Sequence, residues 1–196
     1  VTGDGCGLLM QLPDSFLRQV ATELFNTELT ETYGVGMVFL SQDAAKGTHS
    51  KQVLEEELVA EGLEIVGWRM VPCDDSVLGR MALENMPTIE QVFVNAPGLN
   101  KQELTVKLFI ARRKAENRLA EDEDFYICSL SNSVLSYKGL MMPVDLPNFY
   151  KDLKDPRIEV AMCTFHQRFS TNTLPKWPLA QPFRMLAHNG EINTIR

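Results

Sequence analysis

The sequence lacks the long apolar runs of a membrane protein. No apolar stretch approaches the about 18 residues that cross a bilayer as a helix, and the first residues do not combine the basic and apolar segments of a secretory signal peptide. Basic side chains are in deficit: 19 Lys and Arg stand against 26 Asp and Glu, for a formal net charge of −7. Proteins that bind nucleic acid normally have the opposite balance. We therefore expect no membrane-spanning helix, no signal peptide and no nucleic-acid partner.

Cysteine is rare as well. The four cysteines are widely spaced and mostly lie among apolar residues: Cys6, Cys73, Cys128 and Cys163. Disulfide frameworks and structural zinc sites instead bring cysteines together at short, regular spacings. We expect these four to be small buried hydrophobic residues in a reducing compartment, without disulfides.

The residues that are present describe an ordinary globular domain, with 44% apolar and 23% charged side chains among 196. A folded chain of this length removes about 70% of its extended surface from water, which is enough for one sizeable core. We predict one domain. Because the sequence begins with Val1 and stops at Arg196, just after a promising motif, we expect it to be part of a longer protein.

Hydrophobic patterns predict alternating strands and helices. Strands are expected at residues 6–12, 34–41, 63–71, 89–95, 125–130, 134–138, 158–165 and 183–188. Helices are expected from Pro13-Asp14-Ser15, whose Asp and Ser could cap it, to Phe25, from a Thr48 cap to Gly62, and over 101–120. The last helix should bury a stripe of Leu104, Leu108, Ala111, Ala115 and Leu119, with Arg112, Lys114, Glu116 and Arg118 on its other faces.

Two short patterns add detail. The run Glu55-Glu56-Glu57 is expected to be a solvated helix face. Ser131-Asn132-Ser133 lies between two short predicted strands and indicates a β-hairpin. Many strands with few long helices predict an α+β fold, with strands in sheets and helices outside them.

Polar side chains gather after the strand that ends near His166. Arg168 is followed by Ser170, Thr171 and further hydroxyl and amide groups. A guanidinium donates two parallel hydrogen bonds to a carboxylate, so this loop suits a small carboxylate ligand. The alternative is an arginine paired with a structural Asp or Glu.

A second polar group follows the predicted strand 183–188. Asn189 and Gly190 can present a side-chain N–H and a backbone N–H on adjacent residues, a donor pair that suits an oxyanion. Glycine also allows the backbone to approach a ligand closely. The alternative is an ordinary hairpin turn, for which Asn-Gly is a common signal.

Three segments make the chain resemble a known family. They are TGDGCGLLMQLP at 2–13, HQRFSTNTLPKWPLAQPFR at 166–184 and HNGEINT at 188–194. These segments are similar to the glutaminase domain of glutamate synthases, within the class II, N-terminal-nucleophile glutamine amidotransferases. The resemblance implies a four-layer αββα sandwich, here incomplete at both ends, in which residues 1–196 form a partial amidotransferase domain.

The resemblance also implies a site. Arg168 would bind the α-carboxylate of glutamine, Ser170 and Thr171 would shape the same pocket, and Asn189 and Gly190 would form the oxyanion hole. In this family the thiol of an N-terminal Cys attacks the substrate amide, with its own α-amine as base. The likeness places that Cys upstream of this chain, and an ammonium-binding Asp downstream of it, so the chain alone is expected to be inactive.

The resemblance implies L-glutamine as substrate and a parent enzyme that uses the ammonia to make glutamate from 2-oxoglutarate. FMN, an iron–sulfur cluster and an electron donor, ferredoxin or a small subunit, are expected outside this chain, which should bind no cofactor and no metal. A cytoplasmic protein is expected, or one of the plastid stroma if the parent is plant-type.

Other interpretations of the same residues stay open. Cys6 lies near the start but stands where the family has Ala, so we expect a buried small residue. Cys163, His166 and His188 could be imagined as zinc ligands, although residues three apart on a strand point to opposite faces. Ser170 with a nearby histidine could form a hydrolase, but the Gly-x-Ser-x-Gly elbow is absent. The domain could also bind glutamine, or act as a scaffold, without turnover.

Overall fold

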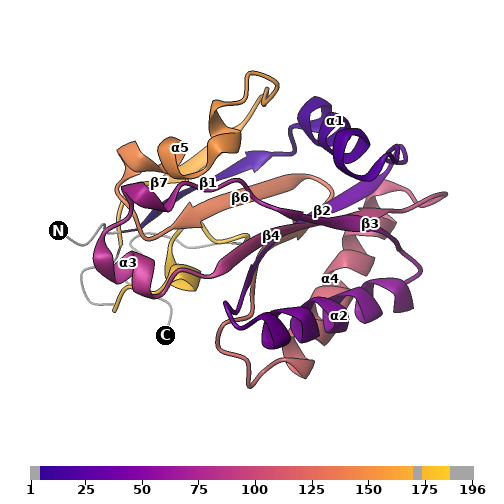
Figure 1. Ribbon diagram of the computed structural model, residues 1–196. Coiled ribbons are helices and arrows are strands. Elements are labelled where there is room, and N and C mark those ends of the chain that lie inside the picture. The colour runs from indigo at the N-terminus through magenta and orange to yellow at the C-terminus, as the bar shows by residue number, and fades with distance from the viewer. Residues whose placement is uncertain (1–4, 170–173, 186–196) are drawn as a thin grey trace, which may run out of the picture.

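The computed structural model describes residues 5–169 and 174–185. Within these ranges the chain forms two antiparallel β-sheets flanked by helices (Figure 1). The α+β class is confirmed. Helices α2 and α4 lie on one side of the molecule, and α1 and α5 lie on the other, with the sheets between them. This order agrees with an αββα sandwich, although α5 is only four residues long.

The larger sheet has the strand order β3-β4-β2-β5. Its strands are β3 (Glu64–Met70), β4 (Thr88–Asn95), β2 (Tyr33–Leu40) and β5 (Tyr126–Ser131). All eight residues of β2 are buried. Both faces of this central strand are covered, which explains why its sequence is a continuous apolar run rather than an alternating one.

Two long helices cover one face of the larger sheet. α2 (Ala44–Ala60) and α4 (Lys101–Arg118) pack against each other and against β2, β4 and β5 in one apolar cluster. The predicted α4 stripe is confirmed, because every residue of it is buried. In the described part of the chain, no helix combines the length and the apolar character that a bilayer crossing requires.

The smaller sheet has the order β6-β1-β7. β1 (Cys6–Gln11) is central and pairs with β6 (Val134–Gly139) along its whole length and with β7 (Cys163–His166) over four residues. A second apolar cluster contains Met10 and Leu135 from this sheet together with Met37 and Phe93 from the larger one. The main core therefore lies between the two sheets.

Short helical segments complete the fold. They are α1 (Asp14–Phe25), α3 (Arg80–Glu84), α5 (Leu146–Phe149) and the 3₁₀ turns Asp75–Val77, Pro143–Asp145, Lys151–Lys154 and Trp177–Leu179. α1 contributes Phe16 and Leu17 to the main core, and α5 contributes Phe149.

A buried polar network crosses the main core. Arg69 of β3 donates to both carboxylate oxygens of Asp152, at 2.8 and 2.6 Å, and to Gln91 of β4 at 2.8 Å. The hydroxyl of Tyr137 on β6 donates to Asp152 at 2.9 Å. Burial and the neighbouring Asp152 raise the pKa of Tyr137 well above its usual value. One carboxylate thus joins strands of both sheets.

The strand predictions are confirmed for β1 to β6, each within one residue of its expected ends. The strand expected at 158–165 is wrong in its first half, because Ile158 donates back to Asp155 in a turn and strand pairing begins only at Cys163. The strand expected at 183–188 is wrong over 183–185, which form no strand. Residues 186–188 lie outside the described residues.

The predicted hairpin is also wrong. β5 and β6 follow each other along the chain but belong to different sheets. The Ser131 hydroxyl accepts hydrogen bonds from the backbone N–H groups of Ser133 and Val134, at 3.0 and 3.3 Å. These bonds tighten the turn, and the chain passes from one sheet to the other instead of pairing with itself.

α1 begins at Asp14 and α4 at Lys101 as expected, but the predicted start of α2 is wrong and the side-chain cap predicted for α1 is absent. α2 begins four residues before Thr48, because the Asp43 carboxylate accepts from the N–H groups of Ala45 and Lys46 at 3.0 and 2.9 Å. These donors lower the pKa of Asp43. α1 has no side-chain cap; Asp14 instead pairs with Arg18 and accepts the Tyr33 hydroxyl. The end of α2 before Gly62, whose φ is +81°, is as expected.

Two expectations for the charged helix faces are wrong. The glutamates of α2 are not simply solvated: Glu55 accepts from the indole of Trp68 at 2.6 Å, and Glu56 and Glu57 both pair with Arg118. Arg112 of α4 is buried rather than surface-exposed and pairs with Glu116. These contacts join the two helices to each other and to β3.

Replacing Asp152 by Asn is expected to lower the free energy of unfolding by about 3–5 kcal/mol, because the Arg69 guanidinium would stay buried without its counter-charge. Glu84→Gln is the control, since its partner Arg80 is 91% exposed, and it should change stability by less than about 1 kcal/mol. Urea denaturation measures both. Equal losses in the two variants would contradict the role given to Asp152.

Candidate functional site

β7 lies at the edge of the smaller sheet, in the described part of the chain, and leads into the candidate substrate loop. It pairs antiparallel with β1, from Gly7↔His166 to Met10↔Cys163. His166 is half-buried at the end of the strand, and Gln167 and Arg168 follow it in exposed positions. The expectation that a strand ends just before Arg168 is therefore confirmed.

Phe169 anchors this loop to the sheet. Its ring is half-buried and packs against the main core. A Cβ built on Gly5 would lie 2.4 Å from Cδ2 of Phe169, and Gly5 has a φ of +79°. A side chain at position 5 would meet both a left-handed backbone and the ring, so glycine is required here. The contact fixes the residue next to Arg168.

Of the predicted site residues, Arg168 lies within the described residues. Arg168 is solvent-exposed, and none of the ion pairs among the described residues involves it. Within those ranges it is not a structural ion-pair arginine. Ser170 and Thr171 of the pocket lie outside the described residues, as do Asn189 and Gly190 of the oxyanion hole, so their roles stay predictions.

Residues 177–185, which we call the strap, cross the end of the smaller sheet. Trp177 is buried, and its indole donates to the Ala82 carbonyl at 3.0 Å. A Cβ on Gly139 would lie 2.4 Å from Cζ3 of Trp177, and one on Gly7 would lie 2.7 Å from the Gln181 carbonyl oxygen. Glycines thus let the strap lie directly on β6 and β1. Trp177 thus packs the strap against the main core.

The far end of the strap is tied to the helical layer. Arg184 donates to the carbonyl of Ile127 on β5 and pairs with Glu116 of α4 at 2.9 Å. The strap ends immediately before residues 186–196, the segment that contains Asn189 and Gly190. Any constraint on the strap therefore bears on where that segment starts.

Lys138 is a buried charge that the sequence analysis missed. It lies on β6 with 1% of its surface exposed and donates to the carbonyl of Pro178 in the strap at 2.7 Å. A signal was present, since a single lysine stands in the otherwise uncharged strand Val134–Gly139. A charge in a short strand is ordinarily read as a solvent-facing position.

The expectation of buried cysteines holds for Cys6 and Cys128, only partly for Cys73, which is half-buried, and not for Cys163, which is exposed. Burial raises the pKa of the Cys6 thiol to about 12, with a further contribution from Asp145. A protonated, buried thiol is a poor nucleophile. The expectation that Cys6 is a small buried residue is confirmed.

The histidine and cysteine of β7 do not form a metal site with other described residues. No group of three or more His, Cys, Asp and Glu side chains in the described ranges could hold a metal ion. His188, the third residue of the zinc alternative, lies outside those ranges.

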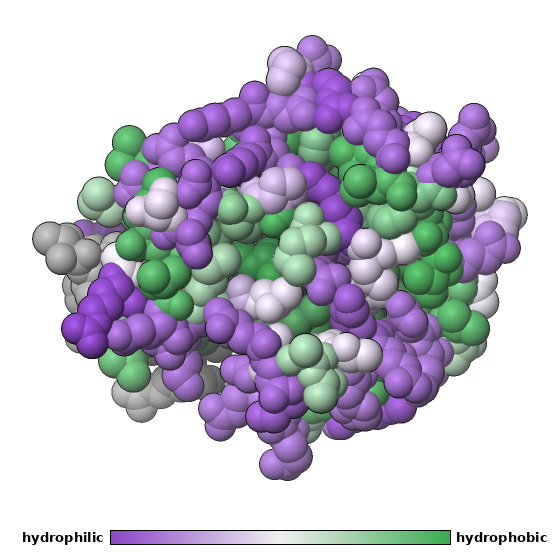
Figure 2. Space-filling model, viewed as in Figure 1, coloured by the Kyte–Doolittle hydropathy of each residue, from purple (hydrophilic) through white to green (hydrophobic). Residues whose placement is uncertain are grey.

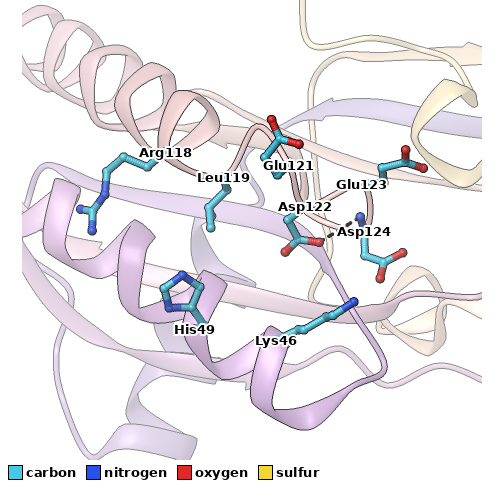
Figure 3. A pocket seen from close by; sticks show the side chains of 8 residues that line it. All are labelled: Lys46, His49, Arg118, Leu119, Glu121, Asp122, Glu123 and Asp124. Atoms are coloured by element: carbon cyan, nitrogen blue, oxygen red, sulfur yellow. Dashed lines mark hydrogen bonds between the residues drawn. The ribbon is translucent and has the colours of Figure 1, made fainter.

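Two cavities lie away from β7 and the strap. One, of about 610 Å³, lies between α2 and the loop after α4; Figure 3 shows Lys46 and His49 facing the acidic residues of that loop. The other, of about 620 Å³, lies beside α1 and β3, where Figure 2 shows apolar residues on the right of the view and where Leu24 and Met70 are more than half exposed. Neither cavity contains a residue of the candidate site.

The chain belongs to the class II glutamine amidotransferases, whose family model matches residues 1–196. The two antiparallel sheets with helices on both sides agree with this family assignment.

Glutamate synthases are among its relatives. The chain is 44% identical to ferredoxin-dependent glutamate synthase 2 of Synechocystis sp. and 42% identical to the glutamate synthase [NADPH] large chain of Bacillus subtilis, over 99% and 100% of its own length. It covers only 12% and 13% of those two proteins. The resemblance to the glutaminase domain of these enzymes is thereby confirmed, and the chain corresponds to a small part of them.

Replacing Gly5 by Ala is expected to destabilise the chain more than replacing Gly62 by Ala. Both glycines have a positive φ, so both variants carry the left-handed penalty of about 1–2 kcal/mol. Only the new methyl at position 5 collides with Phe169, since nothing lies within 4 Å of the corresponding position at Gly62. Urea denaturation of the two variants measures the difference. Equal losses would show that the Phe169 contact does not constrain the loop.

Proposed function

We propose that this chain is part of a glutaminase that hydrolyses L-glutamine to glutamate and ammonia, and that the complete protein delivers the ammonia to a second site that makes glutamate from 2-oxoglutarate. The observation that carries the proposal is the family match over the whole chain, together with a solvent-exposed Arg168 at the end of β7. A cation in this position suits the carboxylate of an amino acid.

The proposed division of roles follows the charges of the substrate. Arg168 binds the α-carboxylate at one end of glutamine, and Ser170 and Thr171 shape the pocket around it. Asn189 and Gly190 donate hydrogen bonds to the oxygen of the side-chain amide, on which negative charge develops during attack. The cation thus fixes the ground state, and the neutral donors act mainly in the transition state.

The nucleophile belongs to a residue that this sequence does not contain. We propose a Cys at the mature N-terminus, whose thiol loses its proton to its own α-amine and attacks the amide carbon. The C–N bond then breaks, ammonia leaves with that proton, and water hydrolyses the thioester to glutamate. Cys6 is unsuited to this step because its thiol is buried on β1.

The reductive half of the reaction needs groups outside this chain. Relatives are named as ferredoxin-dependent or as NADPH enzymes, so we propose FMN and an iron–sulfur cluster in other domains, with ferredoxin or a small subunit as electron donor. Among the described residues, no three Cys, His, Asp or Glu side chains lie together as a metal-binding group, whereas an iron–sulfur cluster is normally held by four cysteines. The cytoplasm or plastid stroma is the proposed location.

The second candidate function is binding of glutamine without turnover, which a complete protein without an N-terminal Cys would show. The complete protein decides between the two. Supplied with glutamine labelled with ¹⁵N in the side-chain amide, 2-oxoglutarate and a reductant, it is expected to place ¹⁵N in the α-amine of new glutamate despite excess unlabelled ammonium. Glutamine binding without labelled product would favour the binding domain.

Replacing Arg168 by Lys in the complete protein is expected to raise KM for glutamine about tenfold and to change kcat less than about twofold, because a point charge replaces a two-pronged donor that acts on the ground state. Steady-state ammonia release measures both constants. Arg80→Lys, at a 91% exposed position, is the control. An unchanged KM would remove Arg168 from the substrate site.

Replacing Asn189 by Ala is expected to lower kcat about 100- to 1,000-fold with little change in KM, since an oxyanion donor acts chiefly in the transition state. The same assay measures it, and Asn148→Ala, at a half-buried position of α5, is the matched control. An unchanged kcat would mean that Asn189 is an ordinary turn residue.

A further inference from the structure

Lys138 contacts the strap on either side of its middle. Its ammonium donates to the Pro178 carbonyl at 2.7 Å and to the Tyr126 hydroxyl oxygen at 3.2 Å. It also lies 4.5 and 5.0 Å from the centres of the Tyr126 and Phe183 rings. The ammonium therefore contacts the strap at Pro178 and at Phe183, on either side of Gln181.

The other strap contacts secure its ends. Trp177 is fixed at the start by its bond to Ala82, and Arg184 is fixed at the end by Ile127 and Glu116. Between them the strap passes over Gly7, which has no side chain to hold it. Lys138 contacts the strap on both sides of this middle part, through a hydrogen bond to Pro178 and through the Phe183 ring.

Packing alone does not account for a lysine at this position. Burial lowers the pKa of Lys138 to about 8, and Arg184 adds a like charge from the strap. From β5, Tyr126 and Cys128 face it, while Glu116 of α4 is engaged by arginines. An apolar side chain of the same length would fill the space without the cost of burying a charge.

We propose that Lys138 is a positioning residue of the hydrolytic site: its bond to Pro178 and its contact with the Phe183 ring set the path of the strap up to Arg184, beyond which the segment with Asn189 and Gly190 follows. The inference rests on the proposed function. Lys138 does not touch the substrate and acts through the strap.

The test uses the complete protein with Lys138→Met, a change that keeps the length of the side chain and removes its donors. Misplacement of a reacting group by about 1 Å can cost about 100-fold in rate. We expect kcat for glutamine hydrolysis to fall about 10- to 100-fold, and KM to change less than about twofold, because Arg168 is held by the Phe169–Gly5 contact and not by the strap.

Lys107→Met is the matched control. Lys107 of α4 also donates to a distant backbone carbonyl, that of Glu61, at 2.6 Å, but it lies in the helical layer away from the strap. It should leave kcat and KM unchanged. A KM effect of Lys138→Met as large as its kcat effect, or an unchanged kcat, would overturn the proposal.

Hydrogen–deuterium exchange supplies a second readout. In Lys138→Met the strap amides should exchange faster, whereas those of β1 and β6 should not. Faster exchange with an unaltered kcat would show that the strap is held but that its position does not matter for catalysis, which overturns the proposal. If the wild-type protein hydrolyses no glutamine, the proposed function fails and the catalytic role fails with it, while exchange still decides whether Lys138 holds the strap.

The pH dependence gives a third readout. An ammonium makes a stronger hydrogen bond to a carbonyl than a neutral amine does, so wild-type kcat should decline as the pH rises past about 8, and Lys138→Met should lack this decline. Should that variant fail to fold, Tyr126→Phe removes one acceptor and keeps the bond to Pro178, and it should lower kcat about threefold. An unchanged profile or an unaltered kcat in Tyr126→Phe would count against the assignment.

Discussion

One buried carboxylate connects the parts of this fold that packing alone would leave free to slide. Apolar contacts between two sheets are not directional, so they set the spacing of the layers but not their relative placement. Asp152 removes that freedom, because the guanidinium of β3 and the hydroxyl of β6 reach it from different sheets. Asp152 lies in the 3₁₀ turn Lys151–Lys154, directly after α5, so the same bonds also fix this turn against both sheets. The placement of the smaller sheet, and hence of β7 and the strap, depends on it.

The loops around the candidate site pack closely against the smaller sheet because three positions there are glycines, which have no side chains. Gly5, Gly7 and Gly139 let a ring, a carbonyl and an indole lie directly against the smaller sheet. Close approach gives these loops fixed positions without secondary structure of their own. The half-buried Phe169 can then hold the backbone while the neighbouring, exposed Arg168 is free to bind a ligand.

Sequence patterns located the strands well and their partners poorly. Alternation and β-branched runs mark where a strand is, and they did so for β1 to β6, but they carry no information on which sheet it joins; β5 and β6 therefore looked like a hairpin. Thr48 was expected as the cap of α2, but residue type alone does not distinguish it from Asp43, which the structure uses. The resemblance of the segment 166–184 to the family pointed to Arg168, and the family match over residues 1–196 includes that segment. Lys138 could not be found in this way, because its importance comes from contacts with Pro178 and Tyr126 that are distant in sequence.

The short connection at Ser131–Ser133 restricts which insertions and deletions the domain can accept, because it joins β5 of one sheet directly to β6 of the other. Side chains alternate along a strand, so one inserted residue would exchange the orientations of Tyr137 and Lys138. The phenol would leave Asp152, and the amine would point toward Arg69. A one-residue deletion there would have the same effect. The exposed loop after α4 can change in length without turning the side chains of β6 to the other face of the sheet. Length variation among descendants of this domain should accordingly accumulate in that loop and be purged from the three-residue corner.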